Sequence, residues 1–150
     1  MQIENQVQPS DPEHIKQMME PGPGGPIFMI NLLKFKDKAE YDDGRATDLS
    51  GRDAYMLYGN AVSRIIEHFG GRVVFMADVT FLSLGKMDEL WDEVAIATYP
   101  ERGDMVRMSM SPEWQAAAVH RTAGLKGQLN IETVIPDFAK ESPWAKALLG

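Results

Sequence analysis

The chain has 150 residues, with 15 lysines and arginines against 22 aspartates and glutamates, so its formal net charge is −7. Hydrophobic residues make up 44% and charged residues 25% of the sequence, which is typical of a globular domain and not of a disordered chain. Cysteine is absent, which excludes disulfides, thiolate metal sites and cysteine nucleophiles. The acidic balance argues against nucleic-acid and anionic-membrane partners.

No targeting or membrane-spanning segment is visible in the sequence. The first residues, MQIENQVQPSDPEH, lack the basic start and the apolar run of a secretory leader. No apolar run reaches the ~18–20 residues that a membrane helix needs. We therefore expect a cytoplasmic protein.

Residues 1–25 are predicted to form an N-terminal extension that contains a short helix over 12–19. Asp11 is a suitable N-cap, and proline at position 12 fits the first helical turn. The run PGPGGP at 21–26 cannot continue a helix and leads into the next element.

The next two elements carry the clearest periodicity. The apolar run IFMINLLKF at 27–35 predicts a strand. Apolar residues spaced by three and four predict an amphipathic helix over 53–69, started by Ser50 and ended by Gly70-Gly71.

The second half of the chain contains three further predicted strands and one helical region. Two apolar runs predict strands, a helical region with a break at Ser111-Pro112 follows, and another strand precedes a tail with a helix start at Ser142-Pro143. The expected ranges are strands over 72–84, 91–99 and 129–134, with the helical region over 102–125.

The order strand, helix, strand, strand, helix, strand is that of the ferredoxin-like βαββαβ fold. The sequence thus predicts an α+β domain with an antiparallel sheet over residues 26–135, followed by a C-terminal tail over 136–150.

Both faces of the predicted sheet are apolar, although helices should cover only one. Apolar residues occupy both sides of the first strand, and on the second strand Val73 and Phe75 are predicted to oppose Val74 and Met76. The simplest cover for the second face is the same face of another copy, which predicts a homodimer whose sheets form a barrel. The alternative is that the terminal segments fold over this face.

Several residues are candidates for a ligand site. Asn31 is the only neutral polar residue in the first strand, where a buried amide needs a partner or a ligand. Tyr58, Trp91 and Tyr99 could line a small apolar pocket. Each could equally serve in core packing or in a structural hydrogen bond.

Two basic residues add possible polar anchors. Arg102 could bind a carboxylate, or pair with Glu101 or Asp104. His120 is the best candidate for proton transfer, because histidine titrates near neutral pH. The three histidines show no closely spaced ligand pair, so no metal site is predicted.

An ordered set of short segments resembles the signatures of one family. These are Gly25-Pro26 with Met29 to Phe35, Ser50-Gly51 with Ala54-Tyr55 and Tyr58-Gly59, Gly70 to Val73, Trp91-Asp92, Tyr99-Pro100 with Arg102, Ser111 to Gln115, His120-Arg121, and Ala123 to Leu125. Over about residues 10–135 the chain resembles the family named domain of unknown function 1330, in the dimeric α/β-barrel superfamily.

The resemblance implies a ferredoxin-like protomer and a barrel dimer, but no settled activity. Superfamily relatives include cofactor-independent monooxygenases, isomerases of small-ring lactones, haem-using enzymes and plain ligand binders, and the fold alone does not choose among them.

Our leading hypothesis is a small homodimer that binds a small organic molecule between the sheet and the helices, as a plain binder or as a monooxygenase- or isomerase-like enzyme. The alternative is a structural or regulatory dimer without a ligand pocket. No cofactor is predicted, although haem stays open through His120 or His68. RNA binding is a third hypothesis, which the acidic charge disfavours.

Overall fold

The structure of the protein is a computed structural model, and it describes residues 3–150. Its elements in chain order are α1 (Pro12–Met18), β1 (Ile27–Phe35), α2 (Gly51–Ile65), η1 (Ile66–Phe69), β2 (Arg72–Asp78), β3 (Glu93–Tyr99), α3 (Arg102–Ser109), α4 (Pro112–Gly124), β4 (Leu125–Thr133), η2 (Asp137–Ala139) and α5 (Pro143–Leu149).

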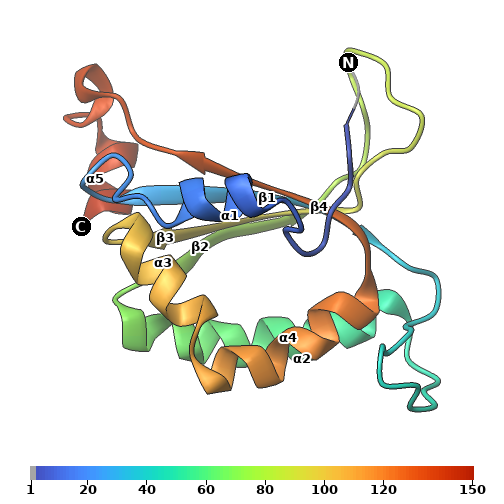
Figure 1. Cartoon of the computed structure of the whole chain (residues 1–150). Coiled ribbons are helices and arrows are strands. Elements are labelled where there is room, and N and C mark those ends of the chain that lie inside the picture. Colours follow the sequence, from blue (N-terminus) through green and yellow to red (C-terminus); the bar gives the residue numbers. More distant parts are fainter. Residues whose placement is uncertain (1–2) are drawn as a thin grey trace.

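The four strands form one antiparallel sheet in the order β2-β3-β1-β4, and α2 and α4 cover one of its faces (Figure 1). This is the ferredoxin-like arrangement, so the predicted α+β fold is confirmed. Within one chain the sheet is open, with β2 and β4 as its edges, and it is not closed into a barrel. We call the face covered by α2 and α4 the inner face, and the opposite one the outer face.

Side-chain caps begin the helices where the sequence predicts them. Ser50 Oγ accepts a hydrogen bond from the Asp53 N–H at the start of α2. Ser111 Oγ accepts one from the Trp114 N–H at the start of α4, and Asp11 caps α1. Each cap satisfies an N–H group that the first helical turn leaves without a partner.

The second strand is shorter than predicted. It ends at Asp78 rather than at residue 84, because its partner β3 begins at Glu93 and these two residues pair at the end of the ladder. Residues 79–92 therefore form a loop. Its base is held by the Val79 N–H, which donates to the Asp92 carbonyl oxygen at 2.9 Å.

The other two strand starts also differ from the predictions. β3 begins at Glu93, two residues after the predicted start at Trp91. β4 begins at Leu125, four residues before the predicted start, because Leu125 and Gly127 pair with the end of β1. Gly124 is the last residue of α4, and Gly127 lies within β4.

A bulge in β2 reverses part of the predicted side-chain alternation. Val73 pairs with Ala97, which belongs to the inner face, whereas Phe75 pairs with Ile96 on the outer face. The register shifts between Val73 and Phe75, so the extra residue, Val74, turns the strand over. The prediction that Val73 and Phe75 share a face is wrong for this reason.

Two clusters of buried side chains fill the space between the helices and the inner face. One joins Leu33, Phe35, Tyr55, Tyr58, Ala95, Ala117 and Leu125; the other joins Ile27, Met29, Ile66, Tyr99 and Met108.

Two glycines, Gly51 and Gly124, allow α2 and α4 to pack closely. A Cβ atom on Gly51 would lie 2.1 Å from the Lys36 carbonyl oxygen and 2.6 Å from the Gly124 carbonyl oxygen. The backbone of α2, of α4 and of the residue that follows β1 therefore meets at a point where no larger side chain fits.

The outer face is covered only in part. Phe28 is 5% exposed, whereas Phe75 is 51% and Ile131 45% exposed. The C-terminal segment turns back so that α5 lies at one end of the sheet, on the side away from α2 and α4 (Figure 1). Arg72 Nη2 donates to the Leu148 carbonyl oxygen at 2.7 Å and anchors α5 there. The C-terminal segment thus covers one end of the outer face.

Candidate functional site

Asn31 lies on the inner face in the middle of β1, and its amide is fully hydrogen-bonded. Nδ2 donates to the carbonyl oxygens of Met29 and Ala95, both at 3.2 Å. Oδ1 accepts from Gln128 Nε2 at 2.8 Å and from Asn130 Nδ2 at 2.9 Å. Two donors and two lone pairs are all that an amide side chain offers. Asn31 therefore holds Gln128 and Asn130 of β4 in place.

Arg121 extends this network from α4. Nη1 donates to Gln128 Oε1 at 3.3 Å, and Nη2 donates to the Val7 carbonyl oxygen at 3.0 Å. Nε is buried and has no hydrogen-bond partner. We call Asn31, Arg121, Gln128 and Asn130 the inner-face polar cluster. It joins β1, β4 and α4 at the β4 edge of the helix–sheet layer.

Aromatic side chains form the wall next to this cluster. The Arg121 Cζ lies 5.2 Å from the centre of the Trp114 ring and 5.9 Å from that of Tyr58. Trp114 Nε1 donates to the Tyr58 hydroxyl oxygen at 3.2 Å. Burial raises the pKa of Tyr58, so its hydroxyl stays protonated at neutral pH. The wall therefore offers aromatic surface and a neutral hydroxyl.

The N-terminal segment closes this edge. It passes beside β4 on its way to α1 (Figure 1). Val7 packs against the first apolar cluster, Gln8 Nε2 donates to Thr122 Oγ1 at 3.3 Å, and Asn5 lies against Gly127. The space around Arg121 is thus covered by residues from a distant part of the sequence.

His120 lies in a different place from Asn31. Its Nδ1 is 2.6 Å from the Tyr41 hydroxyl, and its ring meets that of Tyr41 edge to face. Arg45 stacks over the Tyr41 ring, with its Cζ 4.5 Å from the ring centre. Burial, and then the nearby Arg45 charge, lower the pKa of His120 below the usual 6.5. His120 is therefore neutral at pH 7.

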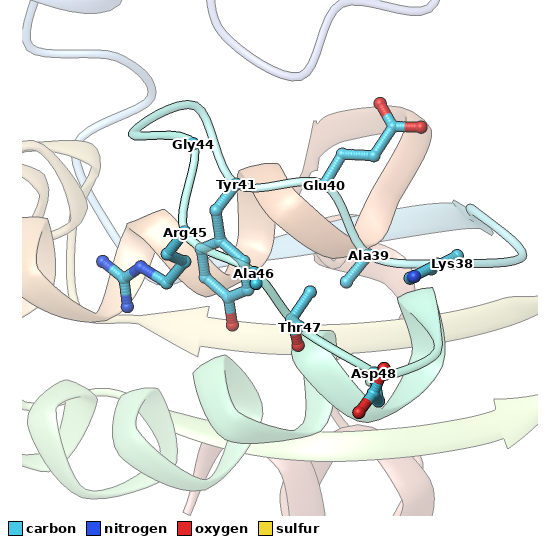
Figure 2. A pocket seen from close by; sticks show the side chains of 9 residues that line it. All are labelled: Lys38, Ala39, Glu40, Tyr41, Gly44, Arg45, Ala46, Thr47 and Asp48. Carbon is cyan, nitrogen blue, oxygen red and sulfur yellow. The ribbon is translucent and has the colours of Figure 1, made fainter.

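Tyr41 and Arg45 belong to an open pocket of about 600 Å³ on the loop that precedes α2. Figure 2 shows their side chains next to each other, while Glu40 points away. The pocket is lined by Lys38, Ala39, Glu40, Tyr41, Gly44, Arg45, Ala46, Thr47 and Asp48.

Arg102 is already bound to a carboxylate of its own chain. Nε and Nη2 donate to the two oxygens of Glu132 at 2.6 Å and 2.9 Å, and Nη1 contacts the carbonyl oxygens of Gln17 and Glu20. Neither Glu101 nor Asp104, the partners considered from sequence, is used. An external anion would have to displace Glu132.

The two remaining predicted site residues lie elsewhere. Tyr99 is 6% exposed and packs in the second apolar cluster, and burial raises its pKa. Trp91 is half-buried just before β3. Among the described residues it joins neither of the two apolar clusters nor a third, smaller one formed by Ala39, Ala54 and Ala123. The six predicted residues Asn31, Tyr58, Trp91, Tyr99, Arg102 and His120 therefore do not form one pocket.

Asp92, next to Trp91, has a structural role. Its carboxylate accepts the Phe35 N–H at 2.8 Å and Lys34 Nζ at 3.2 Å. Lys34 also donates to the Leu90 carbonyl oxygen at 2.8 Å. The loop before β3 is fastened in this way to the end of β1. A second pocket of about 480 Å³ lies here, among lysines and carboxylates that pair with one another.

Within residues 3–150, no three histidine, aspartate or glutamate side chains are grouped so that they could hold a metal ion. None of the helices in this part of the chain is long and apolar enough to cross a membrane.

Sequence reasoning missed Arg121, Gln128 and Asn130 as members of a site. One signal could have found two of them: polar residues alternate with Leu129 and Ile131 along β4, so one side of that strand is polar. Arg121 carried no such signal, because its role depends on Val7, which is 114 positions away.

Comparison with known proteins gives a family and a fold. The model of the domain of unknown function 1330 matches residues 44–133. No curated protein matches the chain at a significant level.

Solved structures give the strongest likeness. A protein of unknown function from Rhodopseudomonas palustris is 30% identical over 89% of this chain and 100% of its own, with a TM-score of 0.77. Its methylated form is 32% identical over 89% of this chain and 98% of its own, with a TM-score of 0.78. The cofactor-independent oxygenase SnoaB from Streptomyces nogalater is 11% identical over 75% of this chain and 95% of its own, with a TM-score of 0.49. The chain belongs to the family named domain of unknown function 1330.

Proposed function

We propose that the protein binds a small organic molecule between its sheet and its helices, at the inner-face polar cluster. The observation that carries this proposal is the convergence of three amides and one guanidinium beside aromatic side chains at the β4 edge of the helix–sheet layer. Ligand sites are typically apolar hollows with a few convergent polar groups. Here the polar groups are Asn31, Arg121, Gln128 and Asn130, and Tyr58 and Trp114 supply the apolar wall.

The proposal is of binding and does not extend to catalysis. His120, the residue expected to transfer protons, is paired with Tyr41 at the loop. The groups at the polar cluster are amides and a guanidinium, which can bind and orient a ligand but do not act as general acids or bases at neutral pH. Monooxygenase- or isomerase-like turnover therefore requires reactivity from the substrate itself.

Ligand-detected NMR with a panel of metabolites tests this function. Compounds that bind the wild-type chain should lose affinity for Asn31→Ala, because that change releases Gln128 and Asn130 from their positions. His120→Ala is the matched control and should bind normally. Thermal melting checks that both variants fold. The proposal fails if no compound binds, or if only His120→Ala loses binding.

A second candidate is a structural or regulatory dimer without a ligand. It is favoured by the complete hydrogen bonding of Asn31, which leaves that amide nothing to offer a ligand. Under this candidate Asn31→Ala would lower stability, and the wild-type chain would bind no compound of the panel. A haemin titration that gives no Soret band would also remove the haem alternative.

We further propose that the protein is a homodimer joined through its outer faces. Phe75 and Ile131 are about half exposed, and Ile30, Leu32, Val94, Ile96 and Leu129 on the same face are only partly covered. A second copy presents an equally apolar face, and a two-fold axis buries both at once. This pairing would not block the inner-face polar cluster, which lies on the other side of the sheet.

A further inference from the structure

We propose that Arg121 binds the carboxylate of a small organic acid, and that residues 5–8 occupy this place when no acid is bound. The inference rests on the proposed function, because it assigns a ligand class and a form of regulation to the same site.

The free edge of the Arg121 guanidinium points to a carboxylate. Nε and Nη2 lie on the same edge of an arginine and can bind both oxygens of one carboxylate. Arg102 uses this edge for Glu132, with distances of 2.6 Å and 2.9 Å. In Arg121, by contrast, Nη2 has one acceptor, the Val7 carbonyl oxygen at 3.0 Å, and the buried Nε has none. A carboxylate would satisfy both donors.

Charge supports the same conclusion. The ion pairs formed within residues 3–150 do not include Arg121. A partly buried guanidinium without a counter-ion is electrostatically unfavourable, and a bound anion would remove that penalty. The faces of Trp114 and Tyr58 favour the cation in place and provide apolar contact for the rest of the acid.

Like such an acid, Val7 provides an apolar group and an oxygen that accepts a hydrogen bond from Arg121. Its side chain packs against the cluster that contains Leu33 and Tyr58, while its carbonyl oxygen accepts from Arg121. It is also the only partly buried residue of the segment 3–10, whose other residues are exposed. The remaining ties are few, with the exposed hydrogen bond from Gln8 to Thr122 among them. An acid that supplies two oxygens could therefore displace the segment.

Titration of the full-length ¹⁵N-labelled chain with benzoate, and with benzamide as its neutral isostere, tests the inference. Benzoate should shift the Arg121 Nε–H and Trp114 Nε1–H resonances, and benzamide should not. Benzoate should also increase the mobility of residues 5–8 in heteronuclear NOE measurements, because it displaces them. A purely structural role for Arg121 would not produce that increase.

Five variants sharpen the titration. Val7→Gly weakens the competing segment and should tighten benzoate binding about fivefold, while the exposed Val134→Gly should not. Arg121→Gln should abolish binding and Arg121→Lys should weaken it, while Arg64→Gln on the surface should leave it unchanged. The inference is overturned if benzoate binds Arg121→Gln as it binds the wild type, if benzamide binds equally well, or if Val7→Gly has no effect.

These outcomes separate the inference from the proposed function. Neutral compounds that shift the Trp114 indole, with no preference for acids, would remove the inference and leave the proposed function standing. If no compound shifts Trp114 in the wild type or in Val7→Gly, both are wrong.

Discussion

The two faces of the sheet are both apolar in sequence, yet their surroundings differ. The inner face packs against α2 and α4, and Leu33 and Ile27 on it are 0% exposed. The outer face leaves Phe75 and Ile131 about half exposed, and α5 covers one of its ends. The inner face also contains the polar cluster, which is joined to the N-terminal segment through Arg121.

This difference separates two kinds of recognition. A small space with a few polar groups suits a small molecule, whereas a broad apolar face suits another protein surface. In our proposals the inner face binds the ligand and the outer face binds the second copy. Changes on each face should affect different measurements.

The largest effect is expected from charges on the outer face. Phe75→Asp combined with Ile131→Asp places carboxylates where the proposed dimer buries apolar surface, and should weaken the dimer by ~100-fold or more. The single chain should fold, because both positions are about half exposed in it. Sedimentation equilibrium measures the dissociation constant. Leu57→Glu, at an exposed site on α2, is the control, and equal dissociation constants for both variants would contradict the account.

Truncation of an apolar side chain should lower the free energy of unfolding more on the inner face than on the outer face. Leu33→Ala should lower the free energy of unfolding by about 2–5 kcal/mol, because Leu33 is fully buried. Ile131→Ala should change it by within about 0.5 kcal/mol when dissociation is removed from the comparison. Urea unfolding of both variants in the Phe75→Asp background measures this. Equal losses would show that the outer face is as tightly packed as the inner one.

Glu93 gives the inner face a pH dependence. It is 4% exposed, Oε1 has no partner, and Oε2 accepts from Arg52 at 3.1 Å. Burial raises its pKa, so the folded chain holds this proton to a higher pH than the unfolded chain. The stability that it contributes is therefore lost as the pH rises from about 4.5 through the folded pKa.

Glu93→Gln should remove that loss. The difference in melting temperature between the variant and the wild type should be more in favour of the variant at pH 7 than at pH 4. Exposed Glu141→Gln serves as the control. Identical differences at the two pH values would show that the Glu93 pKa is not raised.

The smallest effect concerns His120, which lies outside both faces. Arg45→Met should raise the His120 pKa toward the usual 6.5, because it removes a nearby positive charge, although burial still lowers it. In the wild type, the lowered pKa of His120 stabilises the folded chain above about pH 6.5. This stabilisation is lost as the pH falls from 6.5 through the folded pKa, because the unfolded chain takes up the proton first. NMR titration of the ring resonances measures the pKa. Arg64→Met should not move it, and an unchanged value in Arg45→Met would contradict the role given to Arg45.

Most of the fold could be predicted because its signals are local. The caps at Ser50 and Ser111 and the spacing of apolar residues in α2 depend on neighbours within a turn or two. The end of β2 could not be predicted, since VTFLSL at 79–84 is as strand-like as the residues before it. Only the length of β3 decides where pairing stops.

The candidate site was less predictable for the same reason. Asn31 was visible as a polar residue in an apolar strand, but its partners lie 97 and 99 positions away on β4. His120 was attractive as a titratable group, yet α4 turns it toward Tyr41 and turns the next residue, Arg121, toward Gln128. Which of two neighbouring basic residues meets the sheet depends on how α4 packs.

Static light scattering of the unmodified chain at micromolar concentration tests most directly whether a second copy covers the outer face. The account predicts a mass twice the 16.7 kDa of one chain. A mass of 16.7 kDa that does not rise with protein concentration would contradict it.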